Sequence, residues 1–166
     1  MDKTTTNSIG ETQKLGENLA RQLYLRQIKK SAVILGLQGG LGGGKTTFLQ
    51  GLAKGLGIKE KILSPTFIIY KKFKIHGRRQ NWRSSTLMPE YFYHFDCYRL
   101  KGAKDILELG WAEIIQNPKN IVAVEWSERI KKILPKDFIK ISFEFVDENK
   151  RTVIMNYGKE TDNYRF

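Results

Sequence analysis

Cysteine is almost missing from this sequence: Cys97 is the only one among 166 residues. A single cysteine excludes a disulfide within the chain and a metal site built from several cysteines, and it suits a reducing compartment. We therefore expect Cys97 to be inert and to contribute only to packing.

Long hydrophobic runs are missing as well. No stretch reaches the roughly 18–20 apolar residues that a membrane-spanning helix needs. Residues Met1 to Thr6 contain no apolar signal region. These two absences predict a cytoplasmic protein without a membrane partner.

Acidic residues are few compared with basic ones. Asp and Glu number 17 and Lys and Arg number 29, so the formal net charge is +12. This balance favours polyanionic partners such as nucleotides, RNA or an acidic protein, although charge alone does not choose among them. The length is that of one domain with a substantial hydrophobic core.

Glycine is concentrated in one short stretch. Residues 39–46 read Gly-Gly-Leu-Gly-Gly-Gly-Lys-Thr, which has the form G-x-x-x-x-G-K-[ST] of a phosphate-binding loop, or P-loop. The stretch lies between an apolar strand pattern at 31–38 and a helical pattern that includes Phe48, as such a loop must. The alternative, a glycine-rich turn that precedes Lys-Thr by chance, does not explain these flanks.

The loop predicts how a nucleotide and Mg²⁺ would be held. Backbone N–H groups around the glycines can converge on an anion, and the following helix presents the positive end of its dipole. Lys45 is expected to reach the β- and γ-phosphates, and Thr46 to offer its hydroxyl to Mg²⁺. The predicted cofactor-binding residues of this stretch are Gly39, Gly42, Gly43, Gly44, Lys45, Thr46 and Thr47.

Two predicted strands end on carboxylates, at the end where α/β sheets bind ligands. The aromatic strand 91–96 ends at Asp96. The aliphatic strand 121–126 brings Glu125 to its carboxyl end, like the acid of a Walker B segment, so Glu125 is predicted to hold Mg²⁺. The alternative is an acid that caps the next helix. His94 shares a face with Asp96, either as a metal or acid–base pair or as a histidine that is merely hydrogen-bonded.

The remaining patterns predict a single α/β domain. A central, mostly parallel sheet is flanked by helices and extended at an edge by a C-terminal antiparallel β-hairpin. The expected elements are a helix at 10–29, strands at 31–38 and 67–70, helical segments at 105–108 and 111–116, and hairpin strands at 138–145 and 151–155. Gly51 and Gly55, in the helix after the loop, indicate close backbone packing, and Gly57 is expected to end that helix. We expect residues 1–7 and 158–166 to be flexible.

Residues 71–89 are predicted to form a basic, exposed insertion. Its basic side chains surround the aromatic residue Trp82; they are Lys71, Lys72, Lys74, His76, Arg78, Arg79 and Arg83. Residues 71–83 are therefore either an RNA contact, made through phosphates and one stacked base, or a solvated hairpin. Thr66, which precedes the insertion, either ends a loop or senses the γ-phosphate and Mg²⁺ as switch segments do.

Four segments occur together in a fixed order: the loop at 39–46, Ser64-Pro65-Thr66, His94-Phe95-Asp96-x-Tyr98-Arg99 and Val124-Glu125-Trp126. This combination resembles the TsaE (YjeE) family of bacterial P-loop proteins, over about residues 8 to 156. The resemblance implies an ATP-binding protein with weak or partner-stimulated ATPase activity, required to form threonylcarbamoyladenosine at position 37 of tRNAs that read ANN codons. It also implies action on a complex of two partner proteins, TsaB and TsaD.

The resemblance also assigns roles to residues. It implies that Lys45 and Thr46 contact phosphate and Mg²⁺, that Thr66 is the switch-like threonine and that Asp96 is the catalytic acid of hydrolysis. It further implies that Glu125 is the Mg²⁺-associated acid and that Trp126 lies beside the nucleotide. Two loop positions depart from the usual Gly-Asp-Leu-Gly-Ala-Gly-Lys-Thr, because Gly40 and Gly43 replace Asp and Ala.

Two other functions remain open. A small-molecule P-loop kinase would close an arginine-rich lid over its substrates, but the arginine cluster at 78–83 lies far from where a lid would follow the later strands. A basic RNA-binding module without essential catalysis would use the insertion as its contact surface. In the ATPase interpretation, Arg99 is the one obvious candidate for an arginine finger, which predicts slow turnover by the chain alone.

Overall fold

The computed structural model describes residues 1–24, 30–76 and 88–158. The first half contains β1 (Asp2–Thr6), α1 (Ile9–Tyr24), β2 (Val33–Gln38), α2 (Lys45–Gly55) and β3 (Tyr70–Lys74). The second half contains β4 (Tyr91–Asp96), α3 (Lys104–Leu107), α4 (Trp111–Gln116), β5 (Asn120–Glu125), the short 3₁₀ segment η2 (Ser127–Ile133), β6 (Ile139–Phe145) and β7 (Arg151–Asn156).

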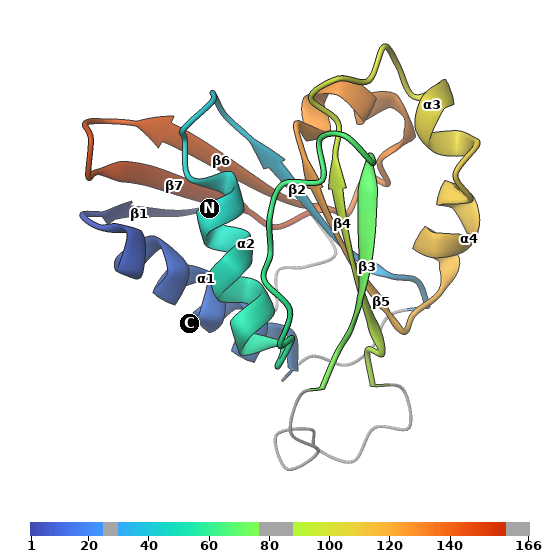
Figure 1. Cartoon of the computed structure of the whole chain (residues 1–166), viewed down its shortest axis with the longest axis horizontal. Coiled ribbons are helices and arrows are strands. Elements are labelled where there is room, and N and C mark those ends of the chain that lie inside the picture. The colour runs from blue at the N-terminus through green and yellow to red at the C-terminus, as the bar shows by residue number, and fades with distance from the viewer. Residues whose placement is uncertain (25–29, 77–87, 159–166) are drawn as a thin grey trace.

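The strands form one seven-stranded sheet with the order β1-β7-β6-β2-β5-β4-β3 (Figure 1). The four central strands, β6, β2, β5 and β4, run parallel to one another. The outer strands pair antiparallel: β3 with β4, β7 with β6 and β1 with β7. The predicted α/β architecture, with a mostly parallel core and a C-terminal antiparallel hairpin, is confirmed.

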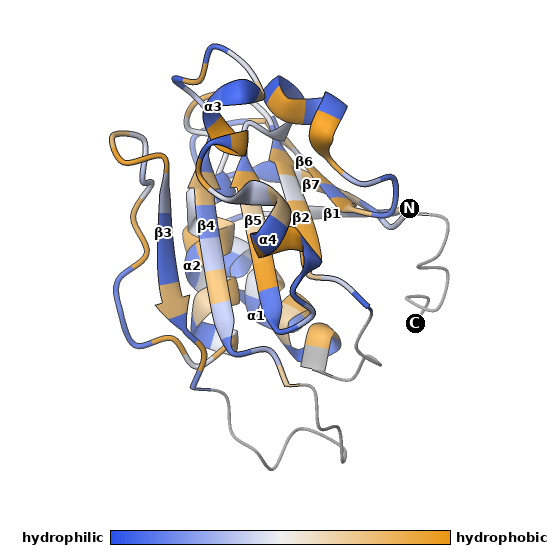
Figure 2. Cartoon of the chain, turned by 90° about the vertical axis from the view of Figure 1, so that its right-hand side faces the viewer, coloured by the Kyte–Doolittle hydropathy of each residue, from blue (hydrophilic) through white to orange (hydrophobic). Residues whose placement is uncertain are grey.

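Helices cover both faces of the sheet because its central strands are apolar on both sides. In β2, Leu35 and Leu37 pack with α1 and α2 in one core, whereas Ile34 packs in a second core with Trp111 of α4. Figures 1 and 2 show α1 and α2 on one face and α3 and α4 on the other. The same alternation turns His94 and Asp96 of β4 toward the α2 side, because Phe92 lies in that core.

The helix pair α1–α2 packs unusually closely, as the glycines in α2 predict. A Cβ atom at Gly51 would overlap the backbone of Gln13, and one at Gly55 would lie 2.6 Å from Cβ of Ala20. Gly57 has φ +73°, a left-handed conformation that ends the helix, and its N–H donates to Lys54 O at 3.1 Å. This close packing holds the helix that follows the P-loop.

Substitution of Gly51 by alanine should therefore destabilise the fold. Overpacking of this kind costs about 1–3 kcal/mol, which lowers Tm by roughly 2–4 °C per kcal/mol in a domain of this size. Gly10→Ala is the matched control, since a Cβ there meets only Ser8 Oγ at 3.8 Å, and it should leave stability unchanged or slightly raised. Thermal unfolding of the two variants makes the comparison; equal Tm values would contradict the packing described here.

Residues 1–7 were expected to be flexible, and this expectation is wrong for residues 2–6. They form β1, which pairs antiparallel with β7 at the edge of the sheet. Three threonines in a row favour extended backbone, and buried Thr6 is hydrogen-bonded to Thr12 Oγ1 at 2.8 Å. The strand buries almost no apolar side chain, so its sequence lacks the usual alternation. Of the other expected flexible end, 159–166 lies outside the described residues.

The expected strand at 67–70 is also wrong. Residues 66–69 form a turn, in which Ile68 N–H donates to Pro65 O at 2.9 Å and Ile69 has φ +66°. Phe67 and Ile68 are exposed, although their residue types favour strands. The chain becomes extended only at Tyr70, where β3 begins.

The basic stretch 71–89 is partly regular structure. Residues 71–74 belong to β3, an edge strand, and Lys71, Lys72 and Lys74 are exposed there. Lysines on an edge strand discourage pairing with another chain. Arg78, Arg79, Trp82 and Arg83 lie outside the described residues, so the choice between an RNA contact and a solvated hairpin stays a prediction.

Cys97 is fully buried, and burial raises the pKa of its thiol to about 12. The thiol therefore stays protonated near neutral pH and fits the expected packing role. Within the described ranges, none of the helices is both long and apolar enough to cross a membrane.

Candidate active site

The P-loop joins β2 to α2, and its path depends on glycine. Gly39, Gly42 and Gly44 have φ values of +134°, +68° and +96°, which residues with a Cβ rarely adopt. A Cβ at Gly43 would lie 2.9 Å from the carbonyl oxygen of Gly40. The loop thus brings its backbone close together directly before α2, whose N-terminus favours an anion.

Lys45, the first residue of α2, turns its ammonium group back into the loop. Its Nζ donates to Gly39 O at 2.7 Å and to Gly40 O at 2.8 Å, and lies 4.1 Å from the centre of the Trp126 ring. The side chain is buried, and burial lowers its pKa, against the opposing effect of nearby carboxylates, the largest from Glu125. Lys45 is thus a buried cation held by two carbonyl dipoles and an aromatic ring.

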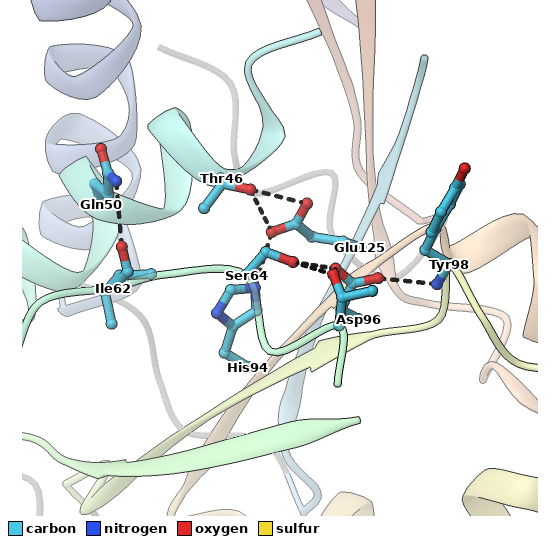
Figure 3. A network of polar contacts seen from close by, with 9 residues as sticks. Thr46, Gln50, Ile62, Ser64, His94, Asp96, Tyr98 and Glu125 are labelled. Atoms are coloured by element: carbon cyan, nitrogen blue, oxygen red, sulfur yellow. Dashed lines mark hydrogen bonds and ion pairs between the residues drawn. The ribbon is translucent and has the colours of Figure 1, made fainter. Parts of the chain in front are cut away.

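Thr46 and Glu125 meet at the carboxyl end of β5. The Thr46 hydroxyl lies 2.8 Å from Glu125 Oε1 and 3.1 Å from Oε2. On its other side Glu125 Oε1 is hydrogen-bonded to His94 Nε2 at 2.9 Å. His94 is fully buried and its Nδ1 has no hydrogen-bond partner in the described part of the chain. Of the two interpretations of His94, the structure therefore favours a hydrogen-bonded histidine, one that orients Glu125 (Figure 3).

Asp96 lies beside Glu125 because β4 and β5 are parallel and pair these two residues. Both oxygens of Asp96 are engaged: Oδ2 accepts from the hydroxyls of Ser64 and Thr66, the latter at 2.7 Å, and Oδ1 accepts from Tyr98 N–H at 2.8 Å (Figure 3). Thr66, the predicted switch-like threonine, is thus hydrogen-bonded directly to the predicted catalytic acid.

These groups surround a cavity of about 380 Å³, within the size range of small-molecule sites. Ten of the predicted site residues line it: Gly42, Gly43, Gly44, Lys45, Thr46, Thr47, Thr66, Asp96, Glu125 and Trp126. Gly39 is not among the lining residues, and its carbonyl oxygen accepts a hydrogen bond from Lys45. The remaining lining residues are Ser8, Ile9, Thr12, Leu41, Ser64, Tyr98, Glu148, Asn149 and Arg151.

The donor set of this cavity suits Mg²⁺ that arrives with phosphate. In residues 1–24, 30–76 and 88–158, no group of three or more His, Cys, Asp or Glu side chains forms a ready-made metal site. Mg²⁺ is usually held by one or two protein ligands together with water and substrate phosphates. One hydroxyl and one carboxylate, Thr46 and Glu125, match that pattern.

The chain matches one known protein family over most of its length. A family model described as "Threonylcarbamoyl adenosine biosynthesis protein TsaE" matches residues 6–153. The chain belongs to the TsaE family. The predicted resemblance is therefore confirmed, and the family is one of threonylcarbamoyladenosine biosynthesis proteins.

Individual TsaE proteins are similar over nearly the whole chain. The tRNA threonylcarbamoyladenosine biosynthesis protein TsaE of Rickettsia conorii is 36% identical over 160 residues, which cover 95% of this chain and 80% of that protein. The TsaE of a Nostoc species is 39% identical over 153 residues, or 90% and 78% of the two chains. Among solved structures, Bacillus subtilis YdiB superposes with a TM-score of 0.66 at 25% identity, covering 98% of this chain and 88% of YdiB.

The two departures from the usual TsaE loop have different structural settings. A Cβ at Gly40 would meet nothing within 4 Å, so there is space for the aspartate that TsaE loops usually carry. A Cβ at Gly43 would be crowded by the carbonyl oxygen of Gly40. The loop therefore has little room for a side chain at position 43. It has room for one at position 40, so steric crowding does not explain why the carboxylate is missing there.

Sequence reasoning missed one side of the cavity. Arg151, at the start of β7, donates from Nε to Gly42 O at 3.1 Å and from Nη1 to Lys150 O at 2.8 Å. Ser8 directly precedes α1, and Ile9 is the first residue of that helix. Arg151 reaches the P-loop because β7 pairs with β6, which lies next to β2, and no local motif in the TsaE-like segments marks that neighbourhood.

Proposed function

We propose that this chain binds ATP with Mg²⁺ in the P-loop cavity and hydrolyses it slowly. One observation carries the proposal: Lys45 and Thr46 of the loop meet Glu125 and Asp96, from the ends of two neighbouring strands, around a single cavity. Phosphate charge would be met by the buried ammonium group of Lys45 and by the N-terminus of α2.

Thr46 and Glu125 are the proposed Mg²⁺ residues. When bound, Mg²⁺ would neutralise the charge on the β- and γ-phosphate oxygens. Glu125 is fixed for this task by the hydrogen bond to His94, and Thr46 by its place in the first turn of α2. Such supporting contacts commonly orient the residues that hold a metal.

Asp96 is the proposed catalytic residue, which accepts a proton from the attacking water or positions that water. Its two oxygens already accept three hydrogen bonds, which leaves only about one of their roughly four lone-pair positions for water. Arg99, the candidate arginine finger, instead packs its guanidinium 4.2 Å from the ring centre of Phe67. Both features support slow hydrolysis by the chain alone.

We propose that the nucleoside packs against Ile9, Thr47 and Arg151, which line the cavity together with the P-loop residues. Trp126 is proposed to lie at the opposite, γ-phosphate end, because its ring packs on the Lys45 ammonium and lies 5.0 Å from the ring centre of Tyr98.

The proposed biological role is formation of the threonylcarbamoyl group on adenosine 37 of tRNAs that read ANN codons, by action on a TsaB–TsaD complex. Membership of the TsaE family supports this role. The basic β3 edge is compatible with an additional direct contact to tRNA through residues 71–83, and the proposed location is the cytoplasm.

Measurement of ATP turnover with and without a TsaB–TsaD complex tests this function. Wild type alone should turn over slowly, and the complex should raise the rate at least about ten-fold, as stimulation by a trans-acting partner does. Glu125→Gln should remain slow in both conditions. A wild-type rate that is unchanged by the complex would overturn the partner-dependent role.

A further inference from the structure

A turn with exposed hydrophobic side chains lies directly next to the cavity. Leu63, Phe67 and Ile68 are 60%, 83% and 63% exposed. Together with Lys61, Ser64, Pro65 and Lys71 they line a groove of about 250 Å³. Figure 2 shows this hydrophobic segment at the outer edge of the molecule, leading into the hydrophilic strand β3. We call residues 63–68 the switch turn.

The switch turn is connected to Asp96 through both side chain and backbone. Ser64 and Thr66 donate their hydroxyls to the Asp96 carboxylate. The Asp96 N–H donates to Ile69 O at 2.8 Å. A displacement of this turn would therefore change which Asp96 oxygens are free.

The backbone at the end of the turn is strained. Ile69 has φ +66°, an outlier for a β-branched residue. Strain of this kind persists only where surrounding contacts hold it, and it is typical of switch segments. The contacts that hold it here are the hydrogen bonds to Asp96 and the bond from Tyr70 N–H to Ile68 O at 2.8 Å. Loss of the hydrogen bonds to Asp96, or of the bond between Tyr70 and Ile68, would therefore favour movement of the turn.

The charge around the switch turn indicates what binds there. Residues 59–71 contain three lysines and one glutamate, and exposed Arg99 packs on Phe67. An apolar centre with a basic rim matches a protein surface in which acidic side chains surround an apolar patch. RNA is a poorer match, because two of the three exposed side chains, Leu63 and Ile68, offer no ring on which a base could stack.

We propose that the switch turn is the docking site for the protein partner that stimulates hydrolysis, and that docking frees Asp96 from Ser64 and Thr66. This inference rests on the proposed function, since it concerns the regulation of the same site. The partner surface is apolar with an acidic rim. Docking at the turn thereby couples partner binding to the availability of the catalytic carboxylate.

The experiment uses the double variant Phe67→Ser/Ile68→Ser and the TsaB–TsaD complex as probe. Both side chains are exposed, so the fold should be retained. Leu107→Ser is the matched control, since Leu107 is 49% exposed on α3, within a different part of the molecule. Four quantities are measured for each variant: affinity for ATP alone, affinity for the complex, affinity for tRNA, and stimulation of ATP turnover by the complex.

We expect the double variant to bind ATP like wild type, to bind the complex at least about ten-fold more weakly and to lose stimulation, while Leu107→Ser matches wild type. Full stimulation of the double variant, in an assay where wild type is stimulated, would overturn the docking site and leave the proposed function intact. Lack of stimulation in wild type would instead refute the proposed function. Loss of tRNA binding with unchanged affinity for the complex would also overturn the inference, in favour of an RNA surface.

A charge reversal provides a second test of the basic rim. Lys71→Glu should weaken binding to the complex, most strongly at low salt, where charge interactions are least screened. Lys132→Glu, an exposed lysine on η2, is the control with the same change in net charge. Equal effects of the two substitutions would contradict an acidic partner surface at the switch turn.

Discussion

Asp96→Asn should reduce ATP turnover by about 10²–10⁴-fold, the usual contribution of a positioned acid or base. ATP affinity should stay close to that of wild type, because an interaction made only in the transition state affects kcat and not binding. The structure accommodates asparagine well. Its Oδ1 can accept from Tyr98 N–H, and its amide can donate to Ser64 and Thr66, whose hydroxyls rotate.

Single-turnover hydrolysis and ATP titration, measured on the same preparation, separate the two effects. Asp105→Asn makes the same chemical change at a surface site, where the carboxylate accepts from Lys101 N–H at 3.0 Å, and should hydrolyse ATP at the wild-type rate. An Asp96→Asn protein with normal turnover would remove Asp96 from the mechanism.

Lys45→Met should reduce ATP affinity by roughly 100-fold or more, since charged hydrogen bonds contribute about 1.5–3 kcal/mol each. The same substitution should leave the nucleotide-free protein at least as stable as wild type. Burial lowers the pKa of Lys45, so the unfolded chain holds this proton more tightly than the folded one. Below that lowered pKa the charged group opposes folding, and methionine removes the opposition.

The pH dependence of the folding stability distinguishes a lysine whose charge opposes folding from a lysine that holds the loop together. Because the folded pKa is lowered, wild-type stability should rise with pH between that pKa and 10.5, the ordinary lysine value. Lys45→Met should lack this rise, whereas Lys104→Met, at an exposed lysine, should keep it. Urea unfolding across the alkaline range gives the comparison. Marked destabilisation of Lys45→Met at neutral pH would mean that the lysine holds the loop together.

Much of the site could be predicted from sequence because its signals are local. The spacing within 39–46 specifies a loop whose geometry depends on positive φ angles. Asp96 and Glu125 each end an apolar strand, and parallel pairing of adjacent strands then brings their side chains together. A parallel sheet also predicts two hydrophobic cores, one on each face, because the central strands of α/β folds are buried on both faces.

The elements that sequence did not predict depend on tertiary contacts. β1 exists because β7 offers it an edge, although its threonines bury little apolar surface. Phe67 and Ile68 have the composition of a strand, but hydrogen bonds to Asp96 hold their segment as a turn. Arg151 reaches the P-loop only because β6 lies beside β2. In each case a partner distant in sequence decides the local structure.

The central claim is that ATP and Mg²⁺ bind together at Thr46 and Glu125. Calorimetric titration of ATP into the nucleotide-free chain, in Mg²⁺ and then in EDTA, tests it most directly. Wild type should bind ATP more tightly with Mg²⁺ than with EDTA, and Thr46→Ala should lose most of that difference while keeping the EDTA affinity. ATP binding of equal affinity in both buffers for both proteins, or no binding at all, would contradict the claim.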